Sequence, residues 1–160
     1  GPDPLDMVRF LGDRMPFRDR TLDLVVLTHG HADHVNGLVE VLRRYKVETV
    51  LQRVSDHEGA PYEAWHRAVG LEGSTAVTAR PGMVIALDDG AFIEVLGPPE
   101  RLRKGTESDV DNASVVLRLV YRDVSFLLTG DMFDDSEGAL VRREARLDSD
   151  VLKVGYPREP

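Results

Sequence analysis

The chain lacks cysteine, long apolar runs and any excess of basic charge, and each absence excludes a class of protein. Without cysteine there are no disulfides or thiolate metal sites, so a transition metal would have to be held by histidine, carboxylate or water. No apolar run approaches the roughly 20 residues that a membrane-spanning helix needs, so we expect the chain itself to be soluble. A net charge of −8 argues against broad attraction to nucleic acid or anionic lipid.

The rest of the composition is that of an ordinary globular domain. Hydrophobic residues make up 42% and charged residues 30% of 160 positions, a length that suits one domain with a substantial core. Bound divalent metals would offset part of the negative charge where a phosphate group approaches. The acidity therefore lowers the expectation that DNA is the substrate without excluding it.

Apolar periodicity predicts helices and strands in alternation through the first half. Helices are predicted over residues 5–12, 35–45 and 61–69, the last ending at Gly70, and strands over 22–28 and 47–52. The run from 22 to 52 is a βαβ unit with a buried, parallel-type first strand. The first half is thus expected to be of the α/β class.

The second half changes to short strands separated by turn residues. Residues 76–98 carry Pro-Gly and Asp-Asp-Gly turns and predict antiparallel hairpins. Two strands are predicted in 114–131 around the Arg122-Asp123 turn, followed by a helix over 136–147 and a strand over 150–155. Together the two halves predict one α/β domain with mixed sheet pairing.

Three of the five histidines and one aspartate fall within six consecutive positions, 29 to 34. They are His29, His31, Asp33 and His34, which follow the first predicted strand. His29 and His31 are two apart, so in extended backbone they point the same way, and the turn that follows lets the other two converge. Neutral imidazole suits Zn, Mn or Fe, so the loop predicts a metal site; an exposed polar loop is the weaker alternative.

The pattern His29-x-His31-x-Asp33-His34 after an apolar strand resembles the signature loop of the metallo-β-lactamase superfamily. In that family the first two histidines serve one metal ion, the Asp-His pair serves a second, and a later aspartate bridges them. Asp131 in "FLLTGD" matches the Gly-Asp motif that supplies the bridge. The resemblance implies an αββα sandwich with mixed sheets, two divalent metal ions, Mn or Zn, and no small-molecule cofactor.

A narrower resemblance covers nearly the whole chain. The segments "LDLVVLTHGHADHVNGL", "DNASVVLRLVYRDVSFLLTGDM" and "SDVLKVG" resemble the extracytoplasmic metallo-β-lactamase-like domain of the ComEC family of bacterial DNA-uptake channels. The resemblance implies a nuclease that degrades the strand not taken up during natural transformation. It also implies that residues 1–160 form a single domain at the extracytoplasmic side of the inner membrane, joined to the channel portion of a larger membrane protein.

Two departures from the superfamily pattern affect the predicted site. In place of a histidine before the Gly-Asp strand, the segment "ESDVDNAS" offers Asp111 and Asn112 as possible metal or phosphate contacts; a solvated acidic turn is the alternative for its aspartates. The family's His-His-Gly-Ser segment is replaced by residues 156–158, Tyr-Pro-Arg, and its Leu-Ile-Asp-Gly-Gly motif is absent. We therefore expect a domain truncated at both ends, or one that has lost part of its site.

Asp33 and Asp131 are the candidate catalytic residues, and three functions are open. The first is a metal-dependent nuclease, in which Asp33 would also orient the attacking hydroxide. The second is a two-metal hydrolase of esters, lactones or thioesters, because fold does not fix substrate. The third is a non-catalytic remnant with an incomplete site.

Overall fold

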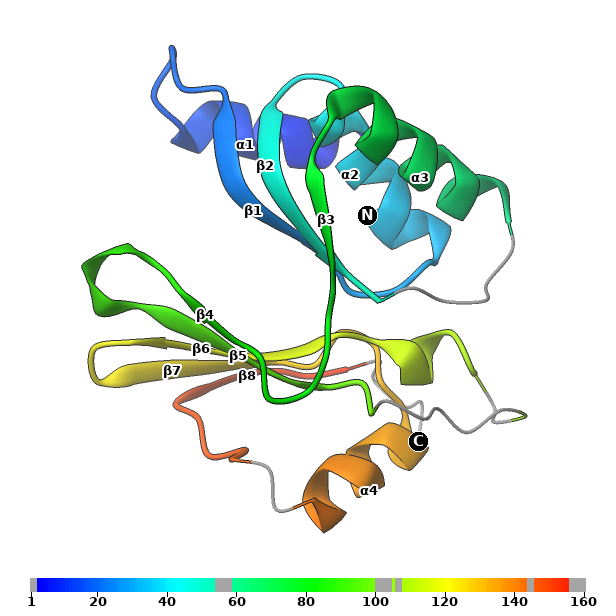
Figure 1. The fold of residues 1–160 in the computed structure, drawn as a ribbon, viewed down its shortest axis with the longest axis vertical. Helices are drawn as coiled ribbons and strands as arrows, with labels where there is room; N and C mark the ends of the chain where they lie inside the picture. Colours follow the sequence, from blue (N-terminus) through cyan, green and yellow to red (C-terminus); the bar gives the residue numbers. More distant parts are fainter. Residues whose placement is uncertain (1–2, 54–58, 100–104, 106–107, 144–145, 156–160) are drawn as a thin grey trace. The chain divides into compact units, whose positions relative to one another are not determined.

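The computed structural model describes residues 3–53, 59–99, 105, 108–143 and 146–155. The chain divides into two compact units, Gly1–Thr78 and Ala79–Pro160, and each unit has its own sheet (Figure 1). The described residues contain four α-helices and eight strands, so the predicted α/β class is confirmed. None of these helices has both the length and the apolar character required to cross a membrane.

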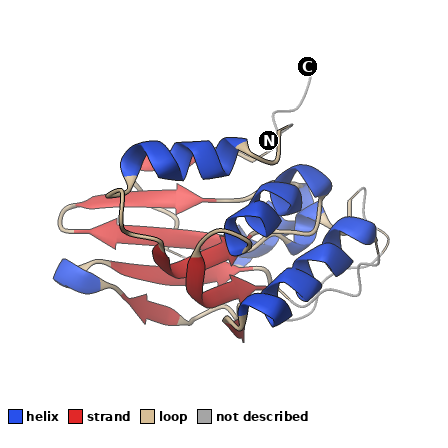
Figure 2. Ribbon diagram, turned by 90° about the horizontal axis from the view of Figure 1, so that it is seen from above, coloured by secondary structure: helices blue, strands red, loops and turns tan. Residues whose placement is uncertain are grey.

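The first unit alternates helices with parallel strands along the chain (Figure 1), and Figure 2 distinguishes the helices from the strands by colour. Its strands pair in the order β1-β2-β3, and both pairings are parallel. The predicted βαβ unit is therefore confirmed. In chain order the elements are α1 Asp6–Arg14, β1 Thr21–Leu27, α2 Ala32–Leu42, β2 Lys46–Gln52, α3 Ala60–Glu72 and β3 Thr75–Thr78.

One apolar core joins the helices of the first unit to its sheet. Val25 of β1, Val50 of β2 and Val35 of α2 are buried in the same cluster as Trp65 of α3, and Val8 of α1 packs against it. Trp65 is fully buried, and its indole N–H donates to Oε1 of Gln52 at the end of β2. The indole therefore fixes α3 to the carboxyl end of the sheet.

The second unit is a mixed five-stranded sheet in the order β4-β5-β6-β7-β8. Neighbouring strands are antiparallel except β7 and β8, which run parallel. Its elements are β4 Val84–Ala86, η1 Asp88–Gly90, β5 Phe92–Gly97, η2 Asp111–Ala113, β6 Val116–Tyr121, β7 Val124–Leu128, α4 Asp134–Arg142 and β8 Val151–Lys153. Leu140 of α4 packs on Val116 and Leu127, so the helix covers part of this sheet.

A carboxylate holds the start of β8 against β7. Oδ2 of Asp150 accepts hydrogen bonds from the backbone N–H of Ser125 at 2.7 Å and from its hydroxyl at 2.9 Å. These bonds, the backbone one first, lower the pKa of Asp150 below its ordinary value, because they favour the charged form. The register of the short strand β8 is thus fixed by the residue that precedes it.

Three predictions of helix bounds in the first unit were wrong. The first helix continues past residue 12 and ends at Arg14. The second helix begins at Ala32, not at residue 35, because Asp33 favours a first helical turn, where its charge meets the positive end of the helix dipole. The third helix passes through Gly70 and ends at Glu72, and Gly73 caps it in the left-handed conformation with a φ of 85°. The buried face of α3 continues as far as Val69, so packing outweighs the cost of Gly70 inside the helix.

Two further predictions need correction in the second half of the chain. Residues 75–78 do not form a hairpin; they pair in parallel with β2 as the third strand of the first sheet. The last helix occupies Asp134–Arg142 and not 136–147, with three acidic residues in its first turn. The strands predicted in 114–131 and 150–155 are confirmed, as is the Arg122-Asp123 turn, where Arg122 has a φ of 54°.

We expect Trp65→Ala to lower the free energy of unfolding by about 3–5 kcal/mol, because it empties a fully buried site and leaves Gln52 without its indole partner. Leu71→Ala is the matched control on the same helix, since Leu71 is 86% exposed. Urea denaturation measures both. Equal losses for the two variants would contradict this description of the core.

Candidate metal centre

Four residues, 28–31, connect the end of β1 to the start of α2. β1 ends at the buried Leu27, and His31 is the N-cap of α2 in extended conformation. The carbonyl of His31 accepts the N–H groups of His34 at 3.0 Å and Val35 at 2.9 Å, which closes the first helical turn. Asp33 and His34 therefore lie in the first turn of α2, where the sequence predicted a turn that precedes the helix.

This connection brings three imidazoles together within the first unit. The ring of His29 lies 4.9 Å from that of His31 and 4.2 Å from that of His34, measured between centroids. A ligand-type nitrogen of His29 lies within 4.8 Å of one on each of the other two. His29 is buried, while the other two are half-buried. Such a set of nitrogen donors at one point fits a transition metal.

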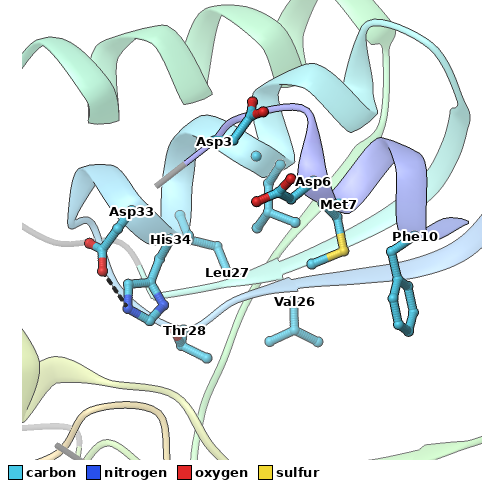
Figure 3. A pocket seen from close by; sticks show the side chains of 11 residues that line it. Asp3, Asp6, Met7, Phe10, Val26, Leu27, Thr28, Asp33 and His34 are labelled. Carbon is cyan, nitrogen blue, oxygen red and sulfur yellow. Dashed lines mark ion pairs between the residues drawn. The ribbon is translucent and has the colours of Figure 1, made fainter. Parts of the chain in front are cut away.

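Two contacts orient these rings. Nδ1 of His29 lies 3.1 Å from the hydroxyl of Thr28, and an Nδ1–H that donates to this oxygen leaves the lone pair on Nε2. Nε2 of His34 lies 3.5 Å from Oδ2 of Asp33, a carboxylate whose side chain is 65% exposed (Figure 3). The sequence reasoning missed the role of Thr28, although its position next to His29 was a usable signal.

A cavity of about 450 Å³ opens beside His34 in the same unit. Apolar side chains from three elements form much of its wall, and carboxylates also line it (Figure 3). Its apolar lining includes Met7, Phe10, Val26 and Leu38, and its acidic lining consists of Asp3, Asp6 and Asp33. The cavity therefore offers an apolar wall with negative charge around it.

The second unit contains the other predicted residues. Asp131 follows β7 after a turn in which Gly130 has a φ of 60°, and its backbone N–H donates to the hydroxyl of Ser114 at 3.2 Å. The side chain of Asp131 is 15% exposed, and its Oδ1 lies 2.9 Å from Nζ of Lys153. This ion pair places a cation directly on the carboxylate that the sequence identified as a metal bridge.

Asp111 and Asn112 lie in the short helix η2, and both are buried. The side-chain Oδ1 of Asn112 accepts a hydrogen bond from the backbone N–H of Phe133 at 3.2 Å. The backbone carbonyl of Asn112 accepts one from the hydroxyl of Ser136 at 2.7 Å. Asn112 thus holds the segment that follows Asp131. The solvated-turn alternative fits Asp109, which is exposed, but not Asp111.

The structure therefore groups the predicted residues into two sets. His29, His31, Asp33 and His34 lie together in the first unit, and Asp111, Asn112 and Asp131 lie in the second. Residues 156–158, which stand in place of the family's last histidine ligand, lie outside the described residues.

Comparisons with known proteins agree with the predicted resemblance. A family model described as the metallo-beta-lactamase superfamily matches residues 11–158. ComE operon protein 3 of Bacillus subtilis (strain 168) is 28% identical over 139 residues, which are 86% of this chain and 17% of that protein. The resemblance to the superfamily is thus confirmed, and the narrower one to the ComEC family is supported by this relative. The chain spans only a small part of the length of the curated relative.

A solved structure, that of a mutant of the CmlA beta-hydroxylase, resembles this fold with a TM-score of 0.58. The two chains are 18% identical, and the match covers 88% of this chain and 26% of the other. At this identity the similarity concerns the fold alone, and it confirms the predicted fold class.

Thr28→Val should weaken the binding of Zn²⁺ by about tenfold, because it removes the oxygen that orients the ring of His29. Thr28→Ser keeps the hydroxyl and should bind as the unchanged chain does. Isothermal titration of the metal-free protein with zinc measures both affinities. Equal affinities for the valine and serine variants would show that the hydroxyl does not orient the ligand.

Proposed function

Since this chain belongs to the metallo-β-lactamase superfamily of metal-dependent hydrolases, we propose that it is a nuclease that hydrolyses phosphodiester bonds of DNA. The observation that carries this proposal is the cluster of three imidazoles after β1, taken with the similarity to ComE operon protein 3. A cluster of imidazoles favours metal binding over a purely structural role, since neutral imidazole is the commonest metal ligand in proteins.

In this proposal the chain holds two divalent ions, Mn or Zn. His29 and His31 would hold one ion, Asp33 and His34 the other, and Asp131 would bind both. The donor set supports the assignment, since neutral imidazole and carboxylate are the ligands that such ions take where thiolates are absent. Two bound ions would supply Lewis-acid activation of water and of a phosphoryl oxygen.

The remaining polar groups would act on the nucleophile and the substrate. Asp33, largely exposed beside His34, would accept a hydrogen bond from the attacking water and orient it. Because Oδ1 of Asn112 already accepts from Phe133, a substrate contact would use its amide N–H groups, which suit a phosphate oxygen better than a metal. Asp111 would then be the member of this pair that could contact metal.

The biological setting proposed here is DNA uptake in bacterial competence. The relative named ComE operon protein 3 supports it, because this chain matches 139 residues of that longer protein. The partners would be DNA and the membrane channel portion of the same parent chain. The site would face the extracytoplasmic side of the inner membrane and degrade the strand that is not taken up.

A second candidate is a hydrolase of esters, lactones or thioesters. The cavity beside His34 favours it, because Met7 and Phe10 offer an apolar wall to an acyl group while Asp3 and Asp6 would repel a polyanion. A non-catalytic remnant is the third candidate, in which the histidine cluster would bind no metal or bind it without turnover.

We expect the chain to nick supercoiled plasmid in the presence of Mn²⁺ and to lose this activity when the metal is chelated. Asp33→Ala should lower the nicking rate by about 100-fold or more, because it removes both a metal ligand and the group that orients water. Gel analysis of nicked and supercoiled plasmid over time measures the rate.

Asp23→Asn is the control, since it removes one carboxylate from an exposed position of β1, the strand that precedes α2. Hydrolysis of p-nitrophenyl acetate is measured in parallel. Ester turnover without nicking would favour the second candidate, and metal binding with neither activity would favour the remnant.

A further inference from the structure

The end of β8 is attached to the loop of Asp131 at three points. Nζ of Lys153 lies 2.9 Å from Oδ1 of Asp131 and donates to the carbonyl of Gly130 at 2.6 Å. The carbonyl of Lys153 accepts the hydroxyl of Thr129 at 2.8 Å. Both ends of the lysine residue, backbone and ammonium, are therefore bound to the segment 129–131.

Close packing adds to these hydrogen bonds. A Cβ atom at Gly155 would lie 2.9 Å from the carbonyl oxygen of Met132, nearer than carbon and oxygen can approach. Glycine at this position lets the chain after β8 pass directly beside the loop. The parallel pairing of Leu128 with Lys153 sets the register from the other side. Lys153 therefore reaches Asp131 from a fixed position.

The two charges of this pair differ in their access to water. The carboxylate of Asp131 is 15% exposed, whereas the side chain of Lys153 is 49% exposed. A carboxylate that is mostly withdrawn from water needs a compensating positive charge, and an ammonium at hydrogen-bonding distance provides it. The half-exposed lysine side chain can move into solvent, whereas the carboxylate of Asp131 has much less access to water.

We propose that Lys153 is the resident counter-cation of Asp131, and that a divalent metal ion has to compete with it for this carboxylate. The inference rests on the proposed function, in which Asp131 is a metal ligand. An ammonium that stays beside Oδ1 offsets the negative charge of the carboxylate and repels a second cation nearby. Lys153 therefore stabilises the metal-free protein and weakens its affinity for metal.

The test compares Lys153→Met, which removes the charge and keeps the chain length, with Lys153→Arg, which keeps the charge. Lys46→Met is the matched control, because it removes a lysine charge that pairs with Glu48 only at 3.6 Å on the exposed surface of β2. Each metal-free protein is titrated with MnCl₂ by calorimetry at a temperature where circular dichroism shows it to be folded. Lys153→Gln replaces the methionine variant if that one does not fold.

We expect Lys153→Met to bind Mn²⁺ about tenfold more tightly than the unchanged chain, from the loss of one cation close to the bound ion. Lys153→Arg and Lys46→Met should bind as the unchanged chain does. In chelator, Lys153→Met should unfold at a lower temperature than Lys46→Met. A double-mutant cycle with Asp131→Asn should assign that loss to the ion pair.

Each outcome decides the matter. Equal or weaker binding by Lys153→Met would overturn the inference while the proposed function stands. Tighter binding by Lys153→Met together with Lys46→Met would show a general effect of net charge, and would also overturn it. If neither the unchanged chain nor Lys153→Met binds Mn²⁺, both the proposed function and this inference are contradicted.

Discussion

The connection of four residues between β1 and α2 is the constraint on which the histidine cluster depends. β1 pairs in parallel with β2, so the chain has to cross the sheet through α2 before it can return. A buried Leu27 fixes one end of the connection, and the first helical turn, closed on the carbonyl of His31, fixes the other. This short connection brings the rings of His29, His31 and His34 close to one another.

In the second unit, hydrogen bonds and an ion pair hold the loop that contains Asp131. Asp131 follows a strand as the histidines do, but its loop is held by contacts from η2 and from the end of β8. The ion pair with Lys153 compensates a carboxylate that water reaches poorly. In a protein with a net charge of −8, one lysine is thus paired with the carboxylate that we propose as a metal ligand.

Much of this was predictable from the sequence, and the failures have physical reasons. The βαβ unit followed from strong apolar periodicity, and the candidate ligands from residue chemistry. The start of α2 was missed because polar ligands occupy its first turn, and Gly70 was mistaken for a helix end because the packing of Trp65 and Val69 is not local information. The pairing of β3 with β2, and of Lys153 with Asp131, depends on sheet order, which no local pattern specifies.

We propose that this chain holds two metal ions on its histidine cluster and Asp131, and anomalous diffraction from crystals soaked in Zn²⁺ would locate them. One peak is expected about 2.0–2.1 Å from nitrogens of His29 and His31 and a second at Asp33 and His34, and Asp131 is expected among the ligands. Peaks confined to surface carboxylates, with the nitrogens of His29 bound to no metal, would contradict it.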